Sequence, residues 1–179
     1  MKCSLYPIKR KDIVSIQEAK QKAGWDITAF NLPDAWKFTE GEGIKIALLD
    51  TGIPDHEDLA GNILDGINIL SKKKSGIDVQ GHASACSGII CAVNNDIGIV
   101  GVAPKAKILP IKVLDDDGSG EMSDVAKGIR YAIDQKADII SLSLGCPKPI
   151  QQVRKAIQLA VSKGIPVFVA AGNAGKQCC

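Results

Sequence analysis

The sequence predicts an α/β domain in three layers, a parallel β-sheet with helices on both of its faces. Two patterns support this prediction. Short apolar runs that end in a polar residue or in glycine alternate along the chain with longer segments of helical periodicity. Within the strand-like runs the apolar residues follow one another without alternation, which is typical of parallel strands that are buried on both faces.

The first 24 residues form an N-terminal arm. Ile13, Ile16 and Ala19 stand at helical spacing among polar residues, which predicts a short surface helix after an extended stretch. Behind the arm, residues 25–38 contain apolar anchor residues and a predicted helical turn. The regular alternation of strand and helix begins only after this region.

Five apolar runs are predicted as strands. Pro110 interrupts the third run and has no backbone N–H to give to a neighbouring strand, so it either weakens the strand prediction or places the strand at an edge of the sheet. The charged residues 71–76 are predicted as a loop, and the polar residues 115–120 are predicted as a turn. The five runs are residues 44–50, 63–70, 107–113, 138–144 and 165–171.

Three segments are predicted as helices of the domain. Residues 80–91 are small and apolar, as in a buried helix. Residues 123–135 and 150–163 carry their apolar side chains on one stripe, which indicates amphipathic helices. Gly164 is predicted to cap the C-terminus of the last helix.

The charge balance excludes some classes of partner. Lys and Arg number 22 against 20 Asp and Glu, so the net charge of +2 gives no electrostatic case for binding nucleic acid or an anionic membrane. Aromatic residues make up only 4% of the chain, too few for a platform that stacks bases. No apolar run approaches the roughly 20 residues of a membrane span.

The cysteines and the N-terminus point to a reducing compartment. Residues 1–7 lack the apolar core of a secretory signal, so a cytoplasmic location with free thiols is expected. Cys86 and Cys91 do not have zinc or redox spacing and are predicted as two small buried core residues. Cys178 and Cys179 form an unusual adjacent pair.

The ends of the predicted strands carry the residues that could perform chemistry, because ligands of parallel sheets bind outside the carboxyl ends of the strands. Asp50 follows one strand and Asn173 follows another, while His82 starts the predicted buried helix. An aspartate can orient an imidazole, and an asparagine amide can donate a hydrogen bond to an oxyanion. Taken singly, each residue also has an ordinary role in a turn, a cap or the core.

Taken together, the motifs resemble the subtilisin-like serine proteases (peptidase S8), most closely the intracellular subtilisins of bacteria. The resemblance begins near Trp36 and identifies residues 25–179 as the N-terminal portion of such a peptidase domain. It implies that Asp50 is the catalytic aspartate, His82 the general base and Asn173 the oxyanion donor. The matching segments are Ile46-Ala47-Leu48-Leu49-Asp50-Thr51-Gly52, His56-Glu57-Asp58-Leu59, Gly81-His82, Gly98-Ile99-Val100-Gly101-Val102-Ala103-Pro104, Ser143-Leu144-Gly145 and Ala170-Ala171-Gly172-Asn173.

The resemblance also implies a substrate cleft and a metal site. Two segments of the chain then form the cleft walls that pair with an extended peptide, and a structural Ca²⁺ is bound by oxygen donors, as this hard ion requires. The segment Leu5-Tyr6-Pro7-Ile8 is similar to the one with which intracellular subtilisins block their own cleft. The implied cleft residues are Gly118, Ser119, Gly120, Ser143, Leu144 and Gly145, and the implied Ca²⁺ ligands are the side chains of Asp58 and Asn95 and the carbonyls of Val93, Ile97 and Ile99.

Two departures from the family pattern stand out. The usual Gly-Thr-His-Val-Ala-Gly after the catalytic histidine is replaced by residues 83–88, so the second histidine is absent and Cys86 replaces the usual valine. The Gly-Thr-Ser-Met-Ala segment that carries the catalytic serine is found nowhere in the 179 residues. Ser119 and Ser143 lack the sequence context of a nucleophile.

The residues suggest two functions and exclude a third. The first is a serine endopeptidase that hydrolyses peptide bonds, present as a truncated or split chain that is inactive alone and is completed by a C-terminal fragment or by self-association. The second is a non-catalytic protease-like protein that binds peptides or a partner. The third, a dinucleotide-binding domain, lacks the Gly-x-Gly-x-x-Gly turn after a strand and is rejected.

Overall fold

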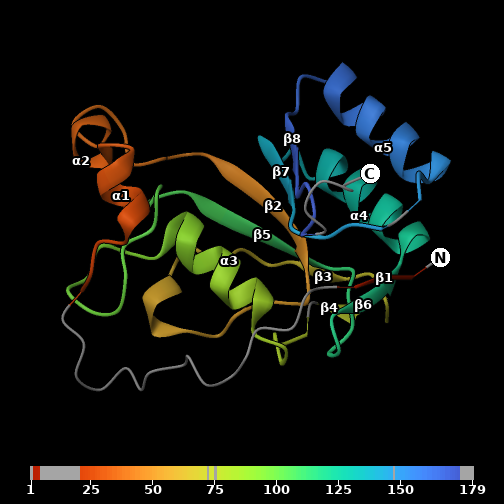
Figure 1. Ribbon diagram of the computed structural model, residues 1–179, viewed down its shortest axis with the longest axis horizontal. Helices are drawn as coiled ribbons and strands as arrows, with labels where there is room; N and C mark the ends of the chain where they lie inside the picture. Colours follow the sequence, from red (N-terminus) through yellow and green to blue (C-terminus); the bar gives the residue numbers. More distant parts are fainter. Residues whose placement is uncertain (1, 5–20, 72, 75, 147, 174–179) are drawn as a thin grey trace.

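A computed structural model describes residues 2–4, 21–71, 73–74, 76–146 and 148–173 (Figure 1). Its centre is a six-stranded sheet in the order β4-β3-β5-β2-β7-β8, parallel throughout except for the antiparallel pair β3–β4. A separate antiparallel pair joins β1 to β6. The strands are β1 (Lys2–Ser4), β2 (Lys45–Asp50), β3 (Ile67–Asn68), β4 (Lys73–Lys74), β5 (Lys107–Lys112), β6 (Ser119–Glu121), β7 (Ile139–Leu142) and β8 (Val167–Val169).

Helices cover both faces of the sheet, as predicted (Figure 1). Alternate residues of β2 point to opposite faces. Ala47 and Leu49 join one apolar cluster with residues of α4 and α5, whereas Ile46 and Leu48 join a second cluster with residues of α3. The helices are α1 (Trp25–Ala29), α2 (Leu32–Ala35), the 3-10 helix η3 (Glu57–Leu59), α3 (His82–Cys91), α4 (Met122–Asp134) and α5 (Gln151–Ser162).

The run through Pro110 is strand β5, and the alternative that it lies at an edge is wrong, because β5 lies between β3 and β2. The Ile108 N–H donates to the Asn62 carbonyl, on the side of β5 that faces β3. Backbone N–H groups two residues apart in a strand point to the same side, so the N–H that Pro110 lacks would also have faced β3. There β3 has not yet started: Gly66 precedes it, and a Cβ on Gly66 would lie 2.0 Å from the Pro110 carbonyl oxygen. The ladder is interrupted where the proline cannot donate.

Several boundaries differ from the predicted ones. The charged loop contains β4, and the polar turn ends in β6. Trp25 and Phe30, expected as apolar anchors, are 78% and 69% exposed, whereas Ile27 between them is buried. The predicted helix through Ile13 and the segment 5–8 lie outside the described residues.

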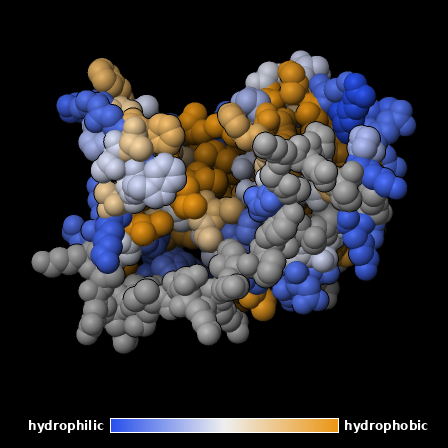
Figure 2. Space-filling model, in the orientation of Figure 1, coloured by the Kyte–Doolittle hydropathy of each residue, from blue (hydrophilic) through white to orange (hydrophobic). Residues whose placement is uncertain are grey.

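The outer strand β8 is poorly covered. Val167 packs on the core, but Phe168 is 62% exposed and Val169 is 53% exposed. Figure 2 shows hydrophobic side chains gathered over the middle of the face it presents and around the region of β7 and β8. Within the described part of the chain, no helix combines the length and the apolar character needed to cross a membrane.

Candidate active site

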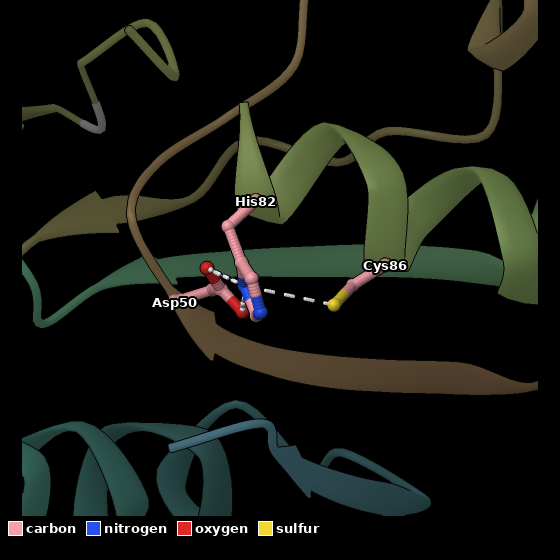
Figure 3. Close-up of side chains that lie close together, drawn as sticks. All are labelled: Asp50, His82 and Cys86. Atoms are coloured by element: carbon pink, nitrogen blue, oxygen red, sulfur yellow. Dashed lines mark hydrogen bonds and ion pairs between the residues drawn. The ribbon is translucent and has the colours of Figure 1, made fainter. Parts of the chain in front are cut away.

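Strand β2 and helix α3 bring Asp50 and His82 together (Figure 3). Asp50 is the last residue of β2 and is 1% exposed, while His82 is the first residue of α3. Both carboxylate oxygens of Asp50 lie 2.9 Å from Nδ1 of the His82 ring. The Thr51 N–H also donates to Oδ1 of Asp50, at 2.7 Å, which fixes the carboxylate plane. This arrangement presents the opposite ring nitrogen, Nε2, for proton transfer.

Asp78 anchors the first turn of α3. Its carboxylate accepts hydrogen bonds from the backbone N–H of Gly81 (2.9 Å) and from the N–H and hydroxyl of Ser84 (2.8 and 2.7 Å). It also accepts from the Thr51 hydroxyl at 2.7 Å, so one carboxylate ties the helix to the residue after Asp50. Gly81 has a φ of 92°, a conformation that favours glycine, and this turn leads the chain into the helix. Sequence reasoning missed Asp78, although an acid just before a helix start is favourable.

The environment of His82 stabilises the protonated ring. The hydrogen bond to Asp50 raises the pKa of His82 from 6.5 to about 10, with a further contribution from Cys86 and opposition from burial. The contact with Asp50 therefore favours the cationic form of the ring. Further burial of the ring would favour the neutral imidazole, the form that a general base needs, because burial lowers a histidine pKa.

Cys86 and Ser143 stand beside the Asp50–His82 pair. Sγ of Cys86 lies 3.7 Å from His82 Nδ1 (Figure 3). The same sulfur lies 3.6 Å from Ser143 Oγ. Cys91 is fully buried, as predicted. Cys86 is only half-buried: it packs against the apolar cluster on the α3 side of the sheet and also borders the candidate site. Sequence spacing contained a signal for this contact, since residues i and i+4 share one face of a helix.

The two expected cleft walls occupy separate strand ends. Gly118 is buried in a turn, Ser119 and Gly120 form β6, and the Ser119 N–H donates to the Asp115 carboxylate at 2.8 Å. Arm strand β1 pairs with this edge, with Cys3 opposite Gly120. Ser143, Leu144 and Gly145 follow β7 in the sequence; Leu144 is buried and Gly145 is exposed.

Asn173 is the last residue that the structure describes. It lies in an exposed bend after β8. Ala170 is still attached to the sheet, because its N–H donates to the Leu142 carbonyl at 3.0 Å. No hydrogen bond connects Asn173 with the other described residues, and its role as oxyanion donor stays a prediction.

A second group of expected residues gathers around Asp58. Its Oδ2 accepts from the Ile99 N–H at 2.9 Å, while Oδ1 is buried without a hydrogen-bond partner among the described residues. The Asp58 carbonyl accepts from Val93 N–H at 2.8 Å. Gly98 has a φ of 56°, and a Cβ there would lie 2.2 Å from Asp58 Oδ2, so the loop closes tightly on the carboxylate.

Gln21 completes this group and was missed by sequence reasoning. Its side-chain Nε2 donates to the carbonyls of Val93 (2.8 Å) and Ile99 (3.2 Å), more than 70 residues away. Asn95 Oδ1 accepts from the Ile97 N–H at 3.2 Å. The region is rich in oxygen atoms and holds an orphaned carboxylate oxygen, which fits a hard cation. No local motif could have shown that residue 21 reaches this loop.

Comparison with known proteins decides the family. The sequence profile of the subtilase family matches residues 41–178, more than half of the chain. The chain belongs to the subtilase family. This confirms the resemblance inferred from the motifs, and the parallel sheet with helices on both faces agrees with it.

Individual relatives are similar over most of this chain. Thermitase of Thermoactinomyces vulgaris is 47% identical over 145 residues, which cover 80% of this chain and 52% of the relative. The intracellular serine protease of Paenibacillus polymyxa is 43% identical over 148 residues, 80% of this chain and 45% of the relative. Subtilisin Savinase of Lederbergia lenta is 39% identical over 156 residues, which cover 87% of this chain and 57% of the relative. This subtilase chain thus spans about half the length of the curated relatives it matches.

Proposed function

We propose that this subtilase chain supplies the Asp–His part of a serine endopeptidase that hydrolyses peptide bonds in proteins. The observation that carries the proposal is the 2.9 Å contact between the buried Asp50 carboxylate and Nδ1 of His82. Asp50 orients the ring and stabilises its cation, while His82 accepts the serine proton at Nε2 and returns it to the leaving amine. Asn173 donates its amide to the oxyanion.

The nucleophile in this proposal is a serine on the remainder of the subtilase domain, carried by a further segment or a separate chain. The 179 residues contain no Gly-Thr-Ser-Met-Ala segment. The exposure of Phe168 and Val169 on outer strand β8 supports a further element docking there. Such docking also buries the site, which lowers the pKa of His82 toward the range of a useful base.

The proposed substrate is an extended peptide held between Gly118–Gly120 and Ser143–Gly145. Backbone pairing at an exposed strand edge suits this role. Arm strand β1 is paired with that edge, Lys2 opposite Glu121 and Ser4 opposite Ser119, which supports a second part of the proposal: the arm of residues 1–24 blocks the cleft. A peptide substrate must then displace β1.

The proposed structural metal is Ca²⁺. Asp58, Asn95 and the carbonyls of Val93, Ile97 and Ile99 would hold it, and Gln21 would add an oxygen if its amide were turned over. The unpartnered buried Oδ1 of Asp58 supports this assignment. A bound Ca²⁺ supplies a cross-link between the chain at residue 21, the turn at η3 and the loop 93–99.

A non-catalytic, peptide-binding role is the second candidate. It is favoured by residues 83–88, which replace the usual family segment after the catalytic histidine and place a thiol beside the ring. For either role we propose a cytoplasmic location, supported by the name of the Paenibacillus relative, an intracellular serine protease.

A complementation experiment separates the two candidates. The 179-residue chain is mixed with the separately produced C-terminal remainder of thermitase, and hydrolysis of a fluorogenic peptide is measured. We expect turnover only when both parts are present, and none with the variant His82→Ala. A stable complex without turnover would favour the binding role, and turnover by the 179-residue chain alone would overturn the proposal.

A further inference from the structure

The half-buried thiol of Cys86 is the feature of the site that peptide hydrolysis does not use. It stands four residues after His82 on the same face of α3, and that face is turned to the end of β2 (Figure 3). One ligand atom each from Asp50, His82 and Cys86 lies within 4.8 Å of the other two. A carboxylate, an imidazole and a thiol thus converge on one point.

We propose that Asp50, His82 and Cys86 form a binding site for a Zn²⁺ ion. Thiolate sulfur, imidazole nitrogen and carboxylate oxygen are the three ligand types that Zn²⁺ takes in proteins. The softer sulfur and nitrogen ligands favour Zn²⁺ over Ca²⁺, whereas the oxygen donors around Asp58 have the opposite preference. The two proposed metal sites therefore discriminate between the two ions.

The separation of the thiol and the imidazole suits a tetrahedral ion, and a carboxylate oxygen lies within 4.8 Å of both. With Zn–S about 2.3 Å and Zn–N about 2.05 Å, tetrahedral geometry separates sulfur and nitrogen by about 3.6 Å. Sγ of Cys86 and Nδ1 of His82 are 3.7 Å apart. The 2.9 Å between Nδ1 and Asp50 must open by roughly 0.4 Å to reach the nitrogen–oxygen separation of such a site. The fourth ligand is water or the Ser143 hydroxyl, whose oxygen lies 3.6 Å from Sγ.

The protein already holds the three side chains in place and leaves a path to them. Asp50 Oδ1 accepts the Thr51 N–H at 2.7 Å, while Oδ2 bonds His82 alone among the described residues. The His82 side chain is 17% exposed, so an ion in solution can reach the cluster. The binding of an ion therefore costs little side-chain entropy.

Zinc binding releases one proton from each of two ligands. The Cys86 thiol loses its proton and becomes the thiolate ligand, and His82 gives up the proton on Nδ1, while Nε2 keeps its own. A ring that is metallated at Nδ1 and protonated at Nε2 has no lone pair with which to accept the serine proton. This consequence rests on the proposed function, in which His82 is the base: bound Zn²⁺ switches the peptidase off, and removal of the ion restores it.

The test uses the complete 179-residue chain, saturated with Ca²⁺, and ZnCl₂ as the probe. Histidine ring signals are followed by NMR, and the chain's second histidine, His56, is the internal reference. We expect the ring signals of His82 to move with one equivalent of Zn²⁺ and those of His56 to stay in place. Binding of Zn²⁺ that leaves the His82 signals unmoved would overturn the proposal.

Two thiol variants give a second readout, the dissociation constant from competition with a chromogenic chelator. Cys86→Val restores the usual family residue and is expected to weaken Zn²⁺ binding at least tenfold. Cys146→Ser removes another half-buried thiol outside the cluster and is expected to leave the constant unchanged. Equal affinities of the wild-type chain and Cys86→Val would contradict the site. Because no hydrolysis is measured, the result stands whether or not the complementation experiment yields a peptidase.

Discussion

The Thr51 hydroxyl donates to Asp78 Oδ1 at 2.7 Å, and this bond joins the end of strand β2 to the start of helix α3. The same hydroxyl accepts from the Ala83 N–H at 3.1 Å. Thr51 follows Asp50 and Ala83 follows His82, so the two bonds fix the neighbours of the paired residues. The position of the imidazole therefore depends on residues that do not themselves touch it.

Asp78→Asn tests this dependence. The amide cannot accept all of the hydrogen bonds that the carboxylate receives, and a bond to a charged group contributes about 1.5–3 kcal/mol. We expect the free energy of unfolding in urea to fall by about that amount. Asp65→Asn, at an exposed carboxylate, is the matched control and should change it little. Equal stabilities of the two variants would show that Asp78 does not anchor the helix.

The protonation of His82 gives a second prediction. Because its pKa is raised from 6.5 to about 10 in the folded chain, the folded state binds this proton more tightly than the unfolded state. The resulting stabilisation is fully present below pH 6.5 and is lost as the pH rises through about 10. In the metal-free chain, NMR titration should show His82 titrating near pH 10, and Asp50→Asn should lower that pKa toward 6.5. A pKa that does not respond to Asp50→Asn would contradict the pairing.

Calcium removal gives a third prediction. If Asp58 and its neighbours bind Ca²⁺, a concentration of 100 times Kd stabilises the fold by about 2.7 kcal/mol. For a chain of this size we then expect chelation to lower Tm by about 5–10 °C. Asp58→Asn should abolish this shift, while Asp55→Asn, an exposed neighbour, should retain it. Identical melting curves with and without chelator would rule out the site.

The uncovered strand β8 gives a fourth prediction. Exposed apolar residues on an outer strand favour association with another chain. We expect the 179-residue chain to self-associate in sedimentation velocity as its concentration rises. Phe168→Lys should shift the equilibrium toward monomer. Phe38 is 89% exposed but is far from β8 in the sequence, so Phe38→Lys should not shift the equilibrium. A wild-type chain that stays monomeric would argue against an incomplete sheet surface.

The strands and helices of the core could be predicted because their signals are local. The apolar stripe of α4 and the run that ends in Asp50 are visible within a dozen residues. Gln21 and Asp78 could not be assigned in this way, since their contacts depend on how distant segments meet. Pro110 was misplaced for the same reason: its tolerance in a central strand depends on Gly66, more than 40 residues earlier.

The residues of the candidate site show the same difference between local signals and contacts that depend on the fold. Asp50 and His82 were found from motifs, and the structure brings them together. The spacing of Cys86 to Cys91 carries no signal for the site, whereas its spacing of four residues to His82 places both side chains on one face of a helix. Asn173 is predicted from its motif alone, and its role stays a prediction.

The measurement that tests the central claim most directly is the rate at which a serine-directed phosphonate labels the complex of this chain with the thermitase remainder. If Asp50 orients His82 as the base, Asp50→Asn should slow labelling by about 10⁴-fold, the size of effect known for this substitution in a serine protease triad. Asp55→Asn should leave the rate unchanged. Labelling of the Asp50→Asn complex at the wild-type rate would contradict the account.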